Sequence, residues 1–152
     1  MNIEALAQLG GFTGTENWYK HPLFPILLYT DGVKHLAENA DCYWLLDLIG
    51  GYQQVATKDP MLRQMQFWRV EPATAPVPAM RNKILKHEKA AGTAVARVVC
   101  ERDSGNTAII HELDITDFPF QAFHGDPAKV WVAPTGDENG RIKMVALLPS
   151  EY

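Results

Sequence analysis

Apolar residues recur at helical spacing in the first third of the chain and alternate like strand residues after position 65. A helix beginning at Thr30 or Asp31 collects four apolar residues on one face: Val33, Leu36, Ala37 and Ala40. Either Thr30 or Asp31 can cap this helix, because both side chains offer an oxygen to the free N–H groups of the first turn. A second helix, over 41–49, is apolar nearly all round from Tyr43 onward and has Asp47 as its internal carboxylate, which predicts a buried helix.

The sequence leaves open whether one helix or two spans residues 31–49. Asn39 tolerates a left-handed conformation and Asp41 can cap a second helix, so the pattern allows a break near Asn39. Trp44 and Leu48 are predicted to be core residues, because they lie within the apolar block.

Five stretches read as strands, namely residues 65–70, 94–102, 107–115, 130–133 and 141–148, and the short apolar run 26–29 is open between a strand and extended coil. The turn at 103–106 joins the second and third stretches into a hairpin, and a loop with Gly136 and Asn139-Gly140 joins the last two. Helices followed by antiparallel strands predict an α+β fold, with N-terminal helices packed on one face of an antiparallel sheet of about five strands.

A stretch rich in proline and alanine interrupts this pattern at about 72–92, and its second half holds a basic cluster of Arg81, Lys83, Lys86 and Lys89. Proline cannot donate to a central ladder, so the stretch reads as an excursion from a single globular domain covering 1–152. Two interpretations of the basic cluster are open: a solvated surface, or an arm that binds an acidic partner.

Composition narrows the classes of function. The 152 residues are 47% hydrophobic and 21% charged, as in one ordinary domain. Fourteen basic and eighteen acidic side chains give a net charge of −4, which disfavours nucleic acid as a partner. The first residues lack the basic region of a secretory signal, and no uncharged stretch is long enough for a membrane span. We therefore expect a cytoplasmic protein without a membrane partner.

No familiar catalytic or cofactor motif is present: there is no Gly-rich phosphate loop, paired-Cys spacing or nucleophile elbow, and we predict no cofactor. An unbroken helix would align four possible metal ligands, Asp31, His35, Glu38 and Cys42. Asp31 is already explained as a cap and a break near Asn39 would displace Cys42, so we predict no metal site. Cys42 and Cys100 are too few for a disulfide framework and are expected to be buried thiols.

Three polar residues are candidates for a pocket between helix 41–49 and the sheet: Tyr43, Asp47 and His111. Burial would raise the pKa of Asp47 unless a donor or cation stabilises its charge, although a structural acceptor is the simpler interpretation. His111 needs a carboxylate from another strand or from a helix, because its strand neighbours point to the opposite face.

Four aromatic residues have no assured place in the core and form a candidate interaction surface: Trp18, Tyr19, Tyr52 and Trp131. The preferred function is a non-catalytic protein-binding module, and the alternative is a small enzyme or ligand binder using the pocket beside helix 41–49. An enclosed pocket with two or more titratable groups would favour the alternative. The sequence names no activity, substrate, partner or oligomeric state.

The order of several short motifs is similar to that of a known family. The motifs are Phe-Thr-Gly-Thr-Glu at 12–16, Trp-Tyr at 18–19, Tyr-Thr-Asp-Gly-Val at 29–33, Tyr-Trp-Leu-Leu-Asp at 43–47, Phe-Trp at 67–68, Thr-Asp-Phe-Pro at 116–119 and Leu-Leu-Pro-Ser-Glu-Tyr at 147–152. Together they resemble a family of small uncharacterised bacterial proteins, a domain of unknown function often found on plasmids and prophages. The resemblance implies a single-domain accessory protein and brings no activity, cofactor or site residues.

The carboxyl end is predicted to be docked on the domain. Leu147, Leu148 and Tyr152 are costly to leave in water, at about 1.5–3 kcal/mol for each large apolar side chain. Pro149 stops the last strand, so that the final residues can turn back over the domain.

Overall fold

The computed structural model describes residues 1–14, 17–136 and 140–152. Within them lie four α-helices: α1 (Ile3–Leu6), α2 (Asp31–Asn39), α3 (Tyr43–Ala56) and α4 (Pro60–Gln64). Three 3-10 helices are also present in this part of the chain: η1 (Leu9–Gly11), η2 (Phe120–Phe123) and η3 (Pro149–Glu151). None of these helices is both long and apolar enough to cross a membrane.

Eight strands form one mixed sheet in the order β1-β2-β8-β7-β3-β5-β6-β4. Their bounds are β1 Trp18–Lys20, β2 Leu27–Thr30, β3 Gln66–Pro72, β4 Lys86–Glu88, β5 Ala96–Glu101, β6 Thr107–Leu113, β7 Ala128–Gly136 and β8 Ile142–Leu147. Two pairs, β2 with β8 and β4 with β6, are parallel, and the other pairs are antiparallel. The predicted five-stranded antiparallel sheet under N-terminal helices is therefore wrong in strand number and in pairing.

The physical reason for this error is the length of the added strands. β1 and β4 have three residues each and β2 has four, too few for a two-residue alternation to stand out. β4 lies inside the stretch read as an excursion, and β2 pairs with residues 144–146 across the whole chain. The two hairpins, β5 with β6 and β7 with β8, are confirmed, although Asn139 of the second loop lies outside the described residues.

The helical region breaks where the sequence allowed it. The Thr30 hydroxyl accepts from the Val33 N–H at 3.3 Å and caps α2, which ends at Asn39. Asp41 has a positive φ of 49°, and Cys42 precedes the first residue of α3. Cys42, rather than Asp41, occupies the N-cap position of α3, and the Asp41 carboxylate pairs with the amino group of Met1 at 2.9 Å.

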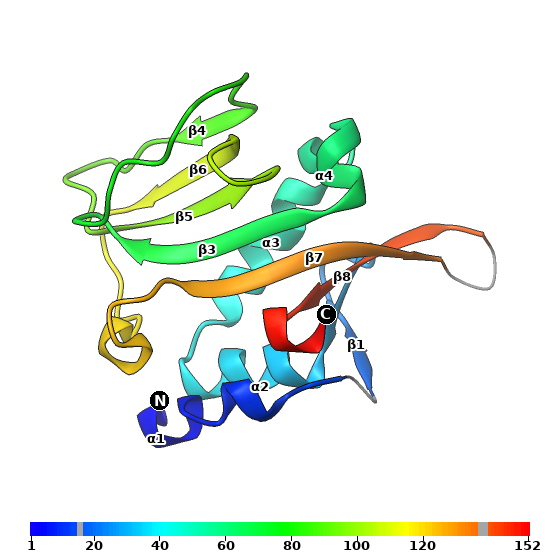
Figure 1. Cartoon of the computed structure of the whole chain (residues 1–152), viewed down its shortest axis with the longest axis horizontal. Coiled ribbons are helices and arrows are strands. Elements are labelled where there is room, and N and C mark those ends of the chain that lie inside the picture. The colour runs from blue at the N-terminus through cyan, green and yellow to red at the C-terminus, as the bar shows by residue number, and fades with distance from the viewer. Residues whose placement is uncertain (15–16, 137–139) are drawn as a thin grey trace.

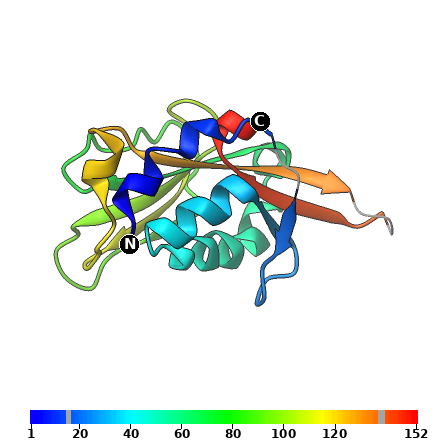
Figure 2. The ribbon, with the colours of Figure 1, turned by 90° about the horizontal axis from the view of Figure 1, so that it is seen from below.

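The hydrophobic core lies between the sheet and the helices α2 and α3, which run along one side of the sheet in Figures 1 and 2. Leu36, Ile49 and Trp68 are among its fully buried side chains. Trp44 and Leu48 are half-buried and pack against this core rather than lying inside it, so the prediction that they are core residues is corrected to a peripheral position.

A buried amide pair fixes α3 to β3 within this core. Gln53 and Gln66 are both fully buried and exchange two hydrogen bonds of 2.8 Å through their side-chain amides. Trp68 donates its indole N–H to the Gln66 oxygen at 2.8 Å. Unpaired amides are costly to bury, so this reciprocal pairing specifies how α3 sits on the sheet.

The opposite side of the sheet, here called the open face, carries the alternate residues of the central strands. Trp68 and Val70 of β3 belong to the core, so Phe67, Arg69 and Glu71 project to the open face. Residues 73–80, here called the covering segment, run over part of this face. It is joined to the residues that directly precede β5 and β6, by a hydrogen bond from Ala73 N–H to Val95 O and by a bridge between Met80 and Asn106.

Candidate functional site

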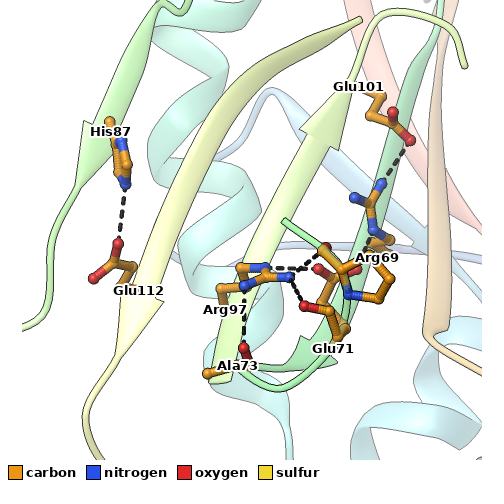
Figure 3. Close-up of polar contacts among 9 residues, drawn as sticks. Arg69, Glu71, Ala73, His87, Arg97, Glu101 and Glu112 are labelled. Carbon is orange, nitrogen blue, oxygen red and sulfur yellow. Dashed lines mark hydrogen bonds and ion pairs between the residues drawn. The ribbon is translucent and has the colours of Figure 1, made fainter. Parts of the chain in front are cut away.

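A row of four alternating charges, the charged ladder, crosses the open face. Its members are Arg97, Glu71, Arg69 and Glu101 (Figure 3). Arg97 Nε donates to Glu71 Oε2 at 2.6 Å, Arg69 Nε donates to Glu71 Oε1, and Arg69 Nη1 donates to Glu101 Oε1 at 2.6 Å. Glu71 is 5% exposed and Arg97 9% exposed, so these charges depend on one another for compensation.

Strand register brings the ladder together. Glu71 lies opposite Arg97 and Phe67 lies opposite Glu101 in the pairing of β3 with β5, so their side chains share the open face. Arg97 also donates to the carbonyl oxygens of Ala75 at 2.9 Å and Pro76 at 2.7 Å. The ladder therefore has a structural task, because Arg97 fastens the covering segment to the sheet.

Beside the ladder, the open face contains a depression of about 300 Å³, here called the aromatic hollow. Its lining residues are Phe67, Trp68, Arg69, Glu101, Asp103, Ser104, Lys129 and Trp131. The rings of Phe67 and Trp131 meet edge to face at 5.2 Å, and Trp131 meets Tyr152 at 5.7 Å in the same manner. Tyr152 is 76% exposed, so the aromatic row continues to the molecular surface.

Two cationic side chains, Arg69 and Lys129, flank the aromatic hollow, and they differ in whether they are ion-paired. Lys129 lies opposite Arg69 in the pairing of β3 with β7, which puts both on the open face. Arg69 is neutralised within the ladder. Lys129 is exposed, and in residues 1–14, 17–136 and 140–152 it takes part in no ion pair. The hollow thus combines the rings of Phe67 and Trp131 with the uncompensated charge of Lys129, while the two carboxylates in its lining, Glu101 and Asp103, are each paired with an arginine.

The three residues predicted to share a pocket each bind a different partner. The Tyr43 hydroxyl donates to Glu38 at 3.3 Å, and burial followed by the Glu38 charge raises the pKa of Tyr43 to about 12. Asp47 is 57% exposed and accepts from His21, rather than being buried as the apolar block suggested. His111 hydrogen-bonds with Tyr52.

His21 is held in one tautomer by its neighbours. Its Nδ1 accepts from the N–H groups of Leu23 at 3.0 Å and Phe24 at 3.1 Å, so Nδ1 carries no proton. The proton of the neutral ring therefore lies on Nε2, which donates to Asp47 Oδ1 at 2.8 Å. Both ring nitrogens are occupied, which leaves His21 no lone pair for general base catalysis.

The Tyr52 and His111 pair lies between α3 and the sheet. The Tyr52 oxygen is 2.7 Å from His111 Nδ1, and burial lowers the pKa of His111 and raises that of Tyr52. A neutral histidine bonded to a neutral phenol is the arrangement expected of a satisfied, half-buried pair.

The four predicted surface aromatics lie in separate places. Trp18 is 49% exposed on the edge strand β1, where the neighbouring Tyr19 donates to Asp31 at 2.8 Å. Tyr52 packs on Trp68 on the helical side of the sheet, and Trp131 lines the aromatic hollow. Trp131 is thus the member of the four that lies at this hollow.

Sequence reasoning missed the charged ladder and the hollow beside it. A signal was present, because Arg69 lies in the predicted strand 65–70 and Glu71 directly follows that strand, while Arg97 and Glu101 alternate with core residues in the predicted strand 94–102. Opposite charges at matching positions of two neighbouring strands indicate cross-strand pairing on one face. The register that aligns them was not available from the sequence.

Both cysteines are buried, and burial raises the pKa of Cys42 to about 12 and that of Cys100 well above its usual value. Thiolates are the reactive form, so neither residue has the character of a nucleophile. Across the described ranges, no group of three or more His, Cys, Asp or Glu side chains is placed to hold a metal ion.

Comparison with known proteins gives a family without an activity. No curated protein and no solved structure matches the chain. A family model described as a family of unknown function (DUF6876) matches residues 3–152, nearly the whole of the chain. The chain belongs to this family of unknown function.

Proposed function

We propose that the chain is a non-catalytic protein-binding module whose aromatic hollow receives an extended segment of a partner protein. The observation that carries this proposal is the pairing of Phe67 and Trp131 with the uncompensated Lys129 at one depression of the open face. Aromatic residues and arginine contribute most of the energy of many protein interfaces, because they bury large areas at low entropic cost. The segment that fits is one with a large apolar side chain beside a carboxylate.

The apolar side chain would lie against the edge of Trp131, between Phe67 and the exposed ring of Tyr152. The carboxylate would meet the ammonium of Lys129, which lies at the rim and is screened by salt. Binding should therefore weaken moderately with ionic strength, with the apolar contact remaining.

The test begins with peptides selected from a random phage-displayed library on the intact chain. Selected peptides are then titrated against three variants: Trp131→Ala, Lys129→Glu and the control Lys20→Glu. We expect sequences that pair a large apolar residue with Asp or Glu, and a loss of about tenfold or more in affinity for Trp131→Ala and Lys129→Glu. Lys20 is exposed on β1, so Lys20→Glu makes the same charge change away from the hollow.

Equal binding of every selected peptide to the parent chain and to Trp131→Ala would overturn the proposal, as would a library that yields no binder. Far-UV circular dichroism of each variant separates lost binding from lost structure. Trp131 is half-buried at the surface, so its removal should leave the core intact.

A ligand site beside α3 is the second candidate, and one observation favours it. A depression of about 610 Å³ lies at the end of β6 and is lined by Trp44, Leu48, Leu113, Ile115, Thr116 and Asp117. Its lining is mainly apolar and contains one titratable group, Asp117, whereas acid–base catalysis commonly uses two. Tyr43, Asp47 and His111 do not line it. An apolar ligand binder, rather than an enzyme, fits this depression.

Fluorescence of an apolar dye such as anilinonaphthalene sulfonate tests that alternative. Dye enhancement in the parent chain that is lost in Leu48→Asp and retained in Trp131→Ala would place a ligand site beside α3. No enhancement would remove this candidate.

Further proposals rest on the sequence and on the resemblance alone. The resemblance supports a bacterial protein carried on mobile elements and acting as a single-domain accessory factor. A cytoplasmic location is part of the same proposal, and the net charge of −4 supports a partner other than nucleic acid. Fractionation of expressing cells, with the tagged chain detected in the soluble or the secreted fraction, tests the location.

A further inference from the structure

Strand β4 is the last strand at one border of the sheet and pairs on one side only, with β6. Its three residues, Lys86, His87 and Glu88, are all exposed. Among the strands of the described ranges, none pairs with the outer side of β4. The outward N–H and C=O groups of such an edge are a template on which an extended chain can add as a further strand.

The edge is held in an extended shape by contacts on its inner side. The Leu85 N–H donates to the Ala108 carbonyl at 2.7 Å, and Arg102 donates to the Lys83 carbonyl at 2.8 Å. His87 Nε2 lies 3.0 Å from Glu112 Oε2 across the β4 and β6 pair, as Figure 3 shows. A strand that is already ordered spares a partner the entropic cost of ordering it.

Charge distinguishes this edge from the rest of the molecule. Three lysines and one glutamate leave a net charge of +2 on residues 83–89, here called the β4 edge, in a chain of net charge −4. Lys83, Lys86 and Lys89 are exposed, and none of them forms an ion pair within residues 1–14, 17–136 and 140–152. The positive charges are therefore available to an incoming chain.

The same lysines oppose pairing of this edge with a second copy of itself, because two such edges would bring like charges together. An acidic strand would instead be attracted to the lysines. Its carboxylates would lie beside the lysines while its backbone completes the hydrogen bonds of β4. The lysines of this edge thus disfavour pairing with a second copy of the same edge and favour pairing with an acidic strand.

We propose that the β4 edge binds an extended acidic segment of a partner protein, which adds to the sheet as a ninth strand beside Lys86, His87 and Glu88. The site is separate from the aromatic hollow, since β5 and β6 lie between β4 and the strands that carry Phe67 and Trp131. The two surfaces can therefore be tested independently.

The probe is a short fluorescein-labelled peptide of alternating Glu and Val with blocked ends, followed by fluorescence anisotropy. Three further probes accompany it: the same peptide with N-methylated valines, a peptide with Lys in place of Glu, and a short DNA duplex. N-methylation keeps the charge and removes alternate backbone donors, so it separates strand addition from simple attraction. Amide hydrogen exchange at residues 86–88 gives a second readout, because added backbone hydrogen bonds slow exchange.

Two exposed lysines on the two edge strands provide a matched pair of variants. We expect Lys86→Glu to weaken binding of the acidic peptide by about tenfold and Lys20→Glu to leave it within about twofold. N-methylation should cost about tenfold or more, and Trp131→Ala should change nothing. Residues 86–88 should gain protection when the acidic peptide is bound.

Several outcomes would overturn the proposal. Equal affinity of the N-methylated and parent peptides would reduce the contact to attraction between charges. Tighter binding of the DNA duplex, lost in Lys86→Glu, would make the β4 edge a nucleic-acid surface. Equal losses in Lys86→Glu and Lys20→Glu, or no binding of the acidic peptide, would show that this edge is not a docking site. Loss of peptide binding in Trp131→Ala would assign the peptide to the aromatic hollow instead.

Discussion

Glu151 joins the last turn of the chain to the start of α2, and its removal tests how the carboxyl end is held. Its Oε1 accepts from the Thr30 hydroxyl at 2.7 Å and from the Leu148 N–H at 2.9 Å. Its Oε2 accepts from the Gly32 N–H in the first turn of α2 at 3.2 Å. The helix dipole places partial positive charge at that turn, so charge and hydrogen bonding act in the same direction.

The expected effect follows from these contacts. Hydrogen bonds to a charged group contribute about 1.5–3 kcal/mol net, and a carboxylate at a helix N-terminus contributes about 0.3–1 kcal/mol. The two contributions overlap, and Glu151 is half-buried, so Glu151→Ala should lower the free energy of unfolding by about 2–3 kcal/mol. For a chain of this size the midpoint of thermal unfolding should fall by about 4–12 °C.

Urea denaturation of Glu151→Ala, with Glu4→Ala as the control, measures this loss. Glu4 is exposed in the first turn of α1, so its removal should be nearly neutral. Gly32→Ala adds an independent check, because a Cβ at Gly32 would lie 2.5 Å from Glu151 Oε1 and 2.7 Å from Leu148 Cδ1. Gly32→Ala should therefore cost less in the Glu151→Ala background than in the parent chain.

A loss below about 0.5 kcal/mol for Glu151→Ala would refute this account. It would mean that the carboxylate is solvated in solution and that the tail is held by the leucines of β8 alone. Deletion of residues 149–152 should then leave the unfolding midpoint unchanged as well.

Three further predictions concern the ladder, the histidine and the amide pair. Arg97→Ala leaves the buried Glu71 short of a cation and frees the covering segment, so urea denaturation should show a loss of about 3 kcal/mol, and trypsin should cut residues 81–89 faster. Burial lowers the pKa of His111 below its usual value of 6.5. The stability that the neutral His111 side chain contributes should therefore be complete above pH 6.5 and be lost as the pH falls through the lowered pKa. The midpoint of the His111 titration, followed by NMR, should lie below 6.5. Gln53→Leu should cost about 1–3 kcal/mol in urea by leaving the Gln66 amide unpaired, and a double change to leucine should recover part of that loss.

Local signals in the sequence were reliable where neighbours in the chain determine the structure. The cap of α2 and the turn at 103–106 depend on a few adjacent residues: the turn forms where it was predicted, and of the two possible caps Thr30, rather than Asp31, is the one used. The break after Asn39 was one of two open alternatives, and the left-handed Asp41 decided it. Each of these features uses a backbone preference that single residues carry.

Features that depend on distant pairing could not be predicted in this way. β2 joins β8 through parallel pairing of residues 27–29 with 144–146, and β4 joins β6 although it lies within the proline-rich and basic stretch. Within the charged ladder, Arg69 and Glu71 of β3 pair with each other and with Glu101 and Arg97 of β5. The cross-strand partners become visible only when the register of β3 and β5 is known.

Asp47 shows how the same limit affects a candidate site. The apolar residues around Asp47 predict that it is buried. In the structure, however, a loop rather than the sheet packs on part of α3. Phe24 of this loop lies so close to Gly50 that a Cβ at Gly50 would be 2.7 Å from the Phe24 ring. His21 in that loop is buried and reaches Asp47, whose carboxylate remains open to water. Asp47 therefore holds the His21 ring in place by accepting a hydrogen bond from its Nε2. Because α3 is apolar on most of its sides, it is buried by the sheet on one side and by the loop that contains His21 and Phe24 on another. Asp47 lies beside this loop, and its carboxylate stays exposed.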